Sequence, residues 1–560
     1  MTGRQGFRIG FCLALASLVG AAAIPAQELA KPSLARVDSI FARYDKTSVP
    51  GCALGVFRAG EISYARGYGM ADLNQGLAID RQTVFYIAST SKQFTAMAVA
   101  LAAEEGLLGL DDSIRKWVPE LPAYADPITV RHLVHHTSGI RDYLGLWGMS
   151  GRSFANEIPL EQGLDLIARQ LSADFAPGAQ WSYSNSGYLL LTEIVARAGK
   201  TSFREFAESR IFGPLGMSHT HFHDDNAEIV SRRAEGYQPA GPGRYRIVRT
   251  SFALVGDGGL LTTIEDLAKW DANFYHNRLG QGRQALIDQV VTPGKYADGS
   301  DLTYAFGLMP GKYRGLRTVR HGGSFIGFRA ELVRFPEQRL SVGVLCNDYT
   351  ADPSALANQV ADLYLADRFP PEPPKAAVAG SRTVRSSLLD SLSGRYEVLP
   401  GLVASVSKQG DGLELLAFGQ RTALAPGAAD TAWVGPGGQA LVFSRLSDGR
   451  YGLLASAFGA RQPVPELGPV PSYDATALAA FVGRYTSQEL DSWFTVEVAE
   501  GQLRYRARWS APVVAQPIRQ DVFSVAGTQL AFDRDRRGNV VGFKLAAGRA
   551  HGIIAERVGR

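Results

Sequence analysis

Ser89 and Lys92 form the first pair of residues whose types and spacing could do chemistry. The segment Ser89-Thr90-Ser91-Lys92 precedes a run over 93–107 in which Ala, Met, Val and Leu recur at helical spacing. Residues three apart share one helix face, so the Lys92 amine can reach the Ser89 hydroxyl. A serine hydroxyl is a poor nucleophile until a base accepts its proton, and a desolvated lysine can be that base. Alone the pair is a weak signal, because Ser89 could also be a plain helix cap.

Tyr183 and Asn185 form a second polar pair, placed between a Pro-Gly turn at 177–178 and an apolar helical run over 189–198. Two residues apart around a turn, their side chains can enter the same cleft. A phenol near an ammonium group loses its proton more easily and can act as acid or base. An asparagine offers a donor and an acceptor to a substrate amide. Whether Lys92 or Tyr183 takes the first proton stays open at this point.

A third segment, His321-Gly322-Gly323-Ser324, lies between two runs that read as neighbouring strands, 316–320 and 328–335. Glycines at a strand edge let a substrate backbone approach closely. A backbone N–H from this strand could complete an oxyanion hole with the N–H of Ser89.

The elements that must position these segments follow from length and pattern. The chain has 560 residues, which exceeds what one hydrophobic core supports. Residues 30–368 alternate helical and strand patterns, and this region holds all three segments. The composition is 46% hydrophobic and 20% charged with a net charge of +4, which excludes global disorder and a polybasic nucleic-acid-binding surface.

The C-terminal part has a different character and contains an internal repeat. Leu392-Ser393-Gly394-Arg395-Tyr396 recurs as Phe481-Val482-Gly483-Arg484-Tyr485, and each copy precedes short strand patterns broken by glycine. The pattern predicts two small antiparallel β-barrel or β-sandwich domains, 384–462 and 472–560, behind a Pro-rich linker at 369–383. One longer β region with a chance match is the alternative.

The ordered set of three motifs resembles the penicillin-recognising serine hydrolases, in particular their class C β-lactamase-like branch of D,D-peptidases, D-aminopeptidases and family VIII esterases. The resemblance covers about 35–365. It includes the look-alike segments 133–140, 258–263 and 264–268. It implies an α+β catalytic domain with an antiparallel sheet flanked by helices, over 30–368.

The resemblance also implies a role for each residue of the three motifs. Ser89 would be the acylated nucleophile and Lys92 its base partner. Tyr183 would pass protons to the leaving atom and later activate water. Asn185 would orient the substrate amide and Lys92, while the backbone N–H groups of Ser89 and Ser324 form the oxyanion hole. His321, Gly322 and Gly323 complete the substrate-binding edge. Neither a cofactor nor a metal is implied.

The third motif departs from the Lys-Thr-Gly that many members carry. A histidine has an unperturbed pKa near 6.5 and is largely neutral at pH 7, so His321 would hold a carboxylate weakly. D-aminopeptidases of this family also use histidine here and append two β-barrel domains. We therefore predict an exported serine hydrolase with poor β-lactamase activity, acting on a small D-amino-acid peptide or an ester. A catalytically weak sensor or binding protein is the alternative.

The N-terminus predicts export. Arg4 and Arg8 precede an uncharged, mostly apolar run over 9–24 with small residues up to Ala26, which reads as a cleaved signal peptide over 1–26. An uncleaved membrane anchor is the rival interpretation. The remaining chain should carry no membrane span and lie in the periplasm or outside the cell. Its two cysteines, Cys52 and Cys346, are expected as buried free thiols, although an oxidising compartment would allow one disulfide.

Several histidines resemble functional residues but favour structural roles. His219, His221 and His223 alternate, as zinc ligands on a strand would. They follow a loop that has no metal role in the family, so no metal is predicted. His135 and His136 lie in a segment that resembles a structural turn. The oligomeric state is left open.

Overall fold

The computed structural model describes residues 32–155, 157–249, 251–371, 384–427, 429, 431–435, 440–455 and 462–559. The predicted signal peptide, 1–26, and most of the predicted linker, 372–383, lie outside these residues. Within the described ranges, the structure contains no helix with the length and apolarity that crossing a bilayer requires.

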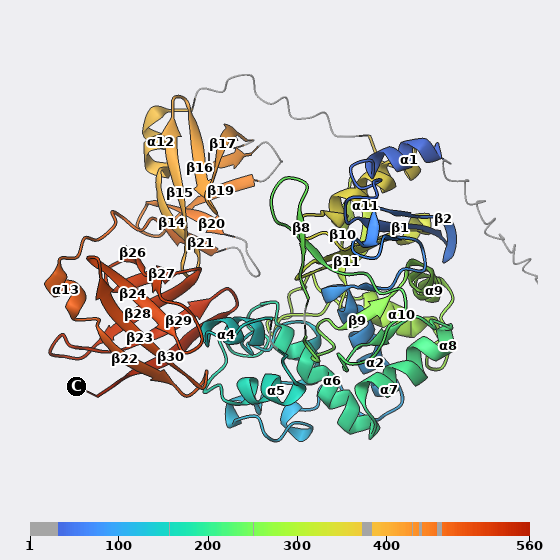
Figure 1. The fold of residues 1–560 in the computed structure, drawn as a ribbon, viewed down its shortest axis with the longest axis horizontal. Helices are drawn as coiled ribbons and strands as arrows, with labels where there is room; N and C mark the ends of the chain where they lie inside the picture. Colours follow the sequence, from blue (N-terminus) through green and yellow to red (C-terminus); the bar gives the residue numbers. More distant parts are fainter. Residues whose placement is uncertain are drawn as a thin grey trace, which may run out of the picture.

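A six-stranded antiparallel sheet forms the centre of the N-terminal region (Figure 1). The first strand of the chain lies beside the last strand of this region, so the sheet brings residues near 55 next to residues near 343. The strand order is β10 (Met309–Tyr313), β11 (Leu316–Phe325), β12 (Phe328–Phe335), β13 (Leu340–Cys346), β1 (Cys52–Arg58) and β2 (Glu61–Tyr68).

Both faces of this sheet are covered, because alternate residues of a strand point to opposite sides. Leu54 and Val56 of β1 pack with residues of α1 (Leu34–Ile40) and α11 (Pro353–Tyr364). Ala53 and Phe57 belong to the larger core, which includes α2 (Lys92–Glu104), α6 (Asn185–Gly199) and α9 (Ile264–Tyr275). This is the helix-flanked α+β arrangement that the motif order implied.

The remaining elements of the region form a mainly helical half and small accessory sheets. The helices are α3 (Val130–Val134), α4 (Tyr143–Met149), α5 (Leu160–Ala168), α7 (Phe203–Ala207), α8 (Gly213–Leu215) and α10 (Gln284–Val291), with a π turn at Glu208–Phe212. The short strands are β3 (Met70–Asp72), β4 (Leu77–Ala78), β5 (Phe85–Tyr86), β6 (His221–Phe222), β7 (Tyr237–Pro239), β8 (Tyr245–Ile247) and β9 (Leu260–Thr262).

The expectation of two free thiols was wrong. Cys52 and Cys346 are directly opposite on the neighbouring strands β1 and β13, and they form a disulfide. The sequence patterns left open which strands pair. The two sulfur atoms come together because β1 and β13, the first and last strands of this sheet along the chain, are neighbours in it.

The C-terminal region forms two nearly closed, barrel-like sheets. The first has eight strands: β14 (Gly394–Leu399), β15 (Leu402–Gln409), β16 (Gly412–Ala417), β17 (Gln420–Pro426), β18 (Ala432–Val434), β19 (Ala440–Arg445), β20 (Tyr451–Ala455) and β21 (Gln462–Pro465). The second has nine: β22 (Gly483–Ser487), β23 (Ser492–Ala499), β24 (Gln502–Ala507), β25 (Val513–Val514), β26 (Gln516–Arg519), β27 (Val522–Val525), β28 (Thr528–Arg534), β29 (Val540–Ala547) and β30 (Ala550–Val558). The short helices α12 (Ser386–Leu392) and α13 (Ala475–Ala479) precede them.

The repeated tyrosine makes the same hydrogen bond in both sheets, from its hydroxyl to the backbone oxygen four residues earlier. The Tyr396 hydroxyl donates to Leu392 O at 2.9 Å, and the Tyr485 hydroxyl donates to Phe481 O at 2.7 Å. Both side chains are fully buried. Each tyrosine therefore ties the first strand of its sheet to the helical segment before it.

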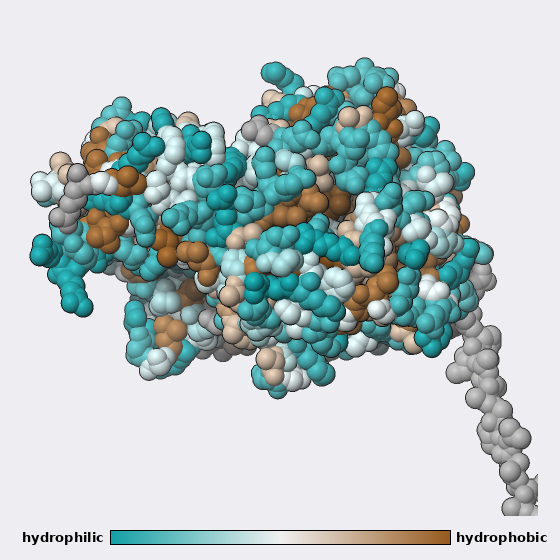
Figure 2. All heavy atoms as spheres, turned by 90° about the horizontal axis from the view of Figure 1, so that it is seen from below, coloured by the Kyte–Doolittle hydropathy of each residue, from teal (hydrophilic) through white to brown (hydrophobic). Residues whose placement is uncertain are grey.

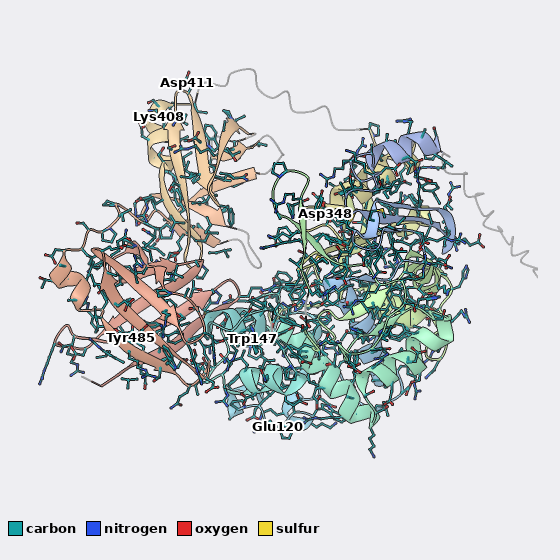
Figure 3. All side chains as sticks on the ribbon, viewed as in Figure 1. Glu120, Trp147, Asp348, Lys408, Asp411 and Tyr485 are labelled. Atoms are coloured by element: carbon teal, nitrogen blue, oxygen red, sulfur yellow. A yellow bond between two sulfur atoms is a disulfide. The ribbon has the colours of Figure 1, made fainter. Side chains whose placement is uncertain are left out.

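The nine-stranded sheet lies against the N-terminal region beside α4 (Figure 1). Arg141 Nη1 and Glu489 Oε1 form an ion pair at 2.5 Å across this boundary, and both side chains are at least 95% buried. Ser492 Oγ donates to Ser150 O at 2.8 Å nearby. Figure 3 labels Trp147 of α4 at the same boundary. Seen from below, the exposed surface is mostly hydrophilic, with apolar residues in separate small patches (Figure 2).

Candidate active site

Ser89 sits in a tight 3-10 turn, Ala88–Ser91, that leads directly into α2. Ala88 has a φ of 47°, a left-handed conformation that costs a non-glycine residue energy and persists only where the surroundings impose it. The turn therefore holds Ser89 at the N-terminal end of α2, where unpaired N–H groups favour negative charge.

Lys92 Nζ is surrounded by three oxygen atoms. It lies 2.6 Å from Asp257 O, 2.8 Å from Asn185 Oδ1 and 3.3 Å from Ser89 Oγ. A carbonyl and an amide oxygen can only accept, so they take two N–H groups of the lysine. In the neutral amine the remaining position is a lone pair, and it faces the Ser89 hydroxyl.

Burial makes that neutral form accessible. The Lys92 side chain is fully buried, and desolvation lowers its pKa to about 7. The Asp257 and Asp142 carboxylates act in the opposite direction, and the Arg549 cation adds to the lowering. At neutral pH a substantial fraction of the protein therefore holds Lys92 as a free base.

Tyr183 completes the polar group around Ser89. Its ring centroid is 4.8 Å from Lys92 Nζ, and its phenol hydrogen-bonds the Ser89 side chain. Burial raises the pKa of the Tyr183 phenol, an effect that the Ser89 hydrogen bond and the Arg549 cation only partly offset. Tyr183 is thus a protonated phenol, suited to donating and relaying a proton, while Lys92 is the group suited to accepting the first one.

Asn185 is held in a defined orientation at the start of α6. Its backbone N–H and its Nδ2 both donate to Asp142 Oδ2, each at 2.9 Å, which leaves Oδ1 facing Lys92. Asp142 is the N-cap of α4 and is 99% buried. The sequence motif at 183–185 predicted Asn185, but its partner Asp142 was missed because it lies on a different helix.

The His321 segment forms part of strand β11 and runs beside the Ser89 turn. A Cβ atom on Gly323 would lie 2.1 Å from Ile87 O, so only glycine permits this close approach. His321 Nδ1 lies 2.7 Å from Gly322 O, an acceptor, and Nε2 lies 3.0 Å from the Tyr304 hydroxyl. Burial lowers the pKa of His321 to about 3. The imidazole is therefore neutral, and both of its nitrogens are occupied within the protein.

Ser89 opens onto two hollows. One is a small, partly open cavity of about 130 Å³. Its lining contains aromatic side chains and one buried carboxyl group: Tyr86, Tyr143, Tyr183, Phe252, Phe325 and Asp257. The other is an open groove of about 990 Å³ along β11, which includes Trp181, His321, Gly322, Gly323 and Glu331. Ser89, Tyr183, Ser324 and Arg549 line both hollows.

All eight residues named from the three motifs thus gather at one place, and the structure adds three that sequence reasoning missed. Asp257 directly precedes the Gly258-Gly259 look-alike segment, which was a local signal. Asp142 carried the weaker signal of a helix cap. Arg549 has none, because it lies in the C-terminal β region and reaches the site only through tertiary packing.

His221, His223 and Glu228 bring ligand atoms within 4.8 Å of one another, while His219 is not part of this group. Two arginines already pair with the group. Arg204 binds both carboxylate oxygens of Glu228, at 2.7 and 2.8 Å, and Arg233 Nη1 lies 3.0 Å from His223 Nε2. Two neighbouring cations disfavour a metal ion at these atoms. The imidazoles of His135 and His136 are buried, with lowered pKa values, among aromatic rings.

Comparison with known proteins agrees with this geometry. The Beta-lactamase family model matches residues 37–366. A D-aminopeptidase of Cereibacter sphaeroides is 29% identical over 466 residues, covering 81% of this chain and 82% of the relative. A penicillin-binding protein of Bacillus subtilis is 27% identical, covering 64% of this chain and 82% of that protein.

A solved structure, the octameric penicillin-binding protein homologue from Pyrococcus abyssi, superposes with a TM-score of 0.56 at 23% identity, covering 84% of this chain and 98% of that one. At that identity it supports the fold alone. The family match spans more than half of the chain and contains all three motifs, so the protein belongs to the β-lactamase family of penicillin-recognising serine hydrolases.

Proposed function

We propose that the protein is an exported acyl-transfer hydrolase that releases an N-terminal D-amino acid from small peptides or amides through a covalent intermediate on Ser89. The observation that carries this proposal is the arrangement of Lys92, whose lone pair faces the Ser89 hydroxyl while two fixed acceptors take its N–H groups.

In the first step, Ser89 Oγ attacks the substrate carbonyl carbon and its proton passes to Lys92 Nζ. The carbonyl oxygen becomes an oxyanion, stabilised by the backbone N–H groups of Ser89 and Ser324. The C–N bond then breaks, and the leaving nitrogen takes a proton from the Tyr183 phenol, which regains one from the Lys92 ammonium. The acyl group remains on Ser89, and the amine departs neutral.

In the second step, a water molecule attacks the acyl-enzyme. Its proton passes through Tyr183 to Lys92, and the Ser89 oxygen leaves with a proton returned along the same path. The products are a free carboxylic acid and the original enzyme. The same machinery would cleave an activated ester, since an alcohol leaves more readily than an amine.

The small cavity beside Ser89 supports a small aminoacyl group as the acyl part. Its volume, about 130 Å³, is below the roughly 300–1,000 Å³ typical of sites for drug-sized ligands. Asp257 offers a carboxyl group to a free substrate amine, and the Tyr143 hydroxyl lies 3.2 Å from its Oδ2. The D configuration rests on the named relative. Export rests on the N-terminal pattern, and the disulfide is compatible with it.

The test is a substrate panel at pH 8 with wild type and Ser89→Ala. We expect D-alanine p-nitroanilide to be cleaved faster than its L isomer. N-acetylation of the D-alanine should reduce kcat/KM strongly, because the acetylated nitrogen no longer pairs with Asp257. A cephalosporin should be hydrolysed slowly, since His321 has no free nitrogen for its carboxylate. Equal rates for the D and L isomers would contradict the assigned substrate, and activity retained by Ser89→Ala would contradict the mechanism.

A further inference from the structure

Arg549 lies at the tip of the β29–β30 hairpin, in the nine-stranded C-terminal sheet. The hairpin reaches across to the N-terminal end of α4, and Arg549 lines both hollows beside Ser89. A residue more than 450 positions from the nucleophile therefore forms part of the active-site wall.

Arg549 is joined to Asp142 twice. Its Nη2 lies 3.0 Å from Asp142 Oδ2, and its backbone oxygen accepts a hydrogen bond from Asp142 N at 3.3 Å. The guanidinium also lies 5.1 Å from the centroid of the Tyr183 ring. Because both the backbone and the side chain of Arg549 make contacts, the guanidinium group is held in a defined position beside Asp142.

The same Asp142 oxygen continues the path to the catalytic lysine. Asp142 Oδ2 accepts both N–H donors of Asn185, and Asn185 Oδ1 then accepts from Lys92 Nζ. Arg549 is thus connected to Lys92 through two intermediate side chains. Removing the cation would leave the carboxylate of Asp142 buried with only neutral donors, which is a costly arrangement.

We propose that Arg549 is a positioning residue for acyl transfer: the second β sheet supplies the cation that neutralises Asp142, and this keeps Asn185 and Lys92 arranged for proton abstraction from Ser89. The inference rests on the proposed role of Lys92 as the base. It makes the C-terminal sheet a part of the catalytic unit, with an effect on chemistry that is separable from its contribution to folding.

The charge balance around Lys92 explains what the cation does. Two carboxylates, Asp142 and Asp257, favour the ammonium form, and Arg549 opposes them. Without Arg549 the pKa of Lys92 rises, so less of the free base is present at neutral pH. The other polar or titratable side chains that face Lys92 come from α6, the loops before α4 and α6, the Ser89 turn and β11: Tyr188, His136, Tyr183, Ser89 and His321.

The test measures how the rate of Ser89 labelling by a fluorophosphonate depends on pH, because this reaction needs the base but no particular substrate. In Arg549→Gln we expect the acid limb to move upward by about one pH unit and the rate at pH 7 to fall about 5-fold, with recovery near pH 9. Arg549→Lys keeps the charge and should keep the wild-type profile. Asp142→Asn combined with Arg549→Gln should recover part of the loss, because the uncompensated carboxylate is gone.

Arg152→Gln is the matched control. Arg152 also crosses to the second sheet, through Leu490 O and Asp491, but it does not contact the Lys92 network. Its profile should match wild type. A loss in Arg549→Gln that is equal at every pH, or an increase in KM for the amide alone with unchanged labelling, would overturn the inference. Labelling or turnover that survives Ser89→Ala would instead overturn the proposed function, whatever Arg549→Gln does.

Discussion

The two C-terminal sheets begin with the same Gly-Arg-Tyr signature but have different relations to the rest of the molecule. The second sheet contacts the catalytic region through a buried ion pair and carries Arg549 into the active site. The first sheet contacts the second one, where Glu397 pairs with Arg519 at 2.5 Å with partial exposure. The shared Gly-Arg-Tyr signature therefore has a structural role in both sheets. The proposed contribution to catalysis comes from Arg549, at the tip of the β29–β30 hairpin and outside the repeat.

The largest effect on stability is expected from a variant that breaks the attachment of the second sheet to the catalytic region. Arg141→Met leaves Glu489 buried without its cation, and breaking a pair of this kind costs about 3–5 kcal/mol. We expect a lower unfolding midpoint and faster proteolytic cleavage between the catalytic region and the sheet. Arg152→Gln, at a more exposed contact of the same boundary, should cost less than about 1 kcal/mol. Equal effects of the two variants would contradict a buried anchor.

The next effect is the pH dependence of catalysis. Because burial lowers the pKa of Lys92 to about 7, kcat/KM for D-alanine p-nitroanilide should rise with pH through that value as the free base forms. Well below pH 7 the decrease should be about tenfold per unit, or about 1.4 kcal/mol. Arg395→Gln, in the first sheet, should leave the pH at which kcat/KM rises unchanged. A shift of that pH would show that the first sheet also acts on the active site.

A smaller pair of effects tests the repeat itself. Tyr396→Phe and Tyr485→Phe each remove one buried hydrogen bond to a backbone oxygen, and each should cost about 1 kcal/mol in thermal or denaturant unfolding. Neither should change the pH profile of Ser89 labelling. If Tyr485→Phe altered that profile and Tyr396→Phe did not, the signature would have a functional part in one sheet only.

The smallest effect concerns the contact between the sheets. Arg519→Gln breaks the partly exposed pair with Glu397 and should cost less than about 1 kcal/mol, decreasing further at high salt. Activity at pH 8 should be unchanged within error. A large loss of activity would indicate that the first sheet supports the active site through the second.

The sequence predicted the fold class and, from three short segments, the eight motif residues that gather at one place, but not Asp142, Asp257 and Arg549 beside them. Each segment combines residues that lie within one turn or on one strand, so their mutual placement depends on local geometry. The pairing of β1 with β13 was not predictable in this way, and the favoured state of Cys52 and Cys346 was wrong for that reason. The signal peptide and the exact linker bounds stay predictions.

The sequence by itself determined that a serine and a lysine share one face at the start of a helix, and that a neutral histidine replaces a lysine on the neighbouring strand. Ser89 and Lys92 are three residues apart on one helical turn, so local geometry places their side chains on the same side of the chain. Only the tertiary structure decided that Asp142 orients Asn185 and that Arg549 neutralises Asp142. Asp142 and Asn185 are 43 residues apart, whereas Asp142 and Arg549 are more than 400 residues apart. Both contacts exist because a buried carboxylate requires partners, and only the packing of the domains brings them to Asp142.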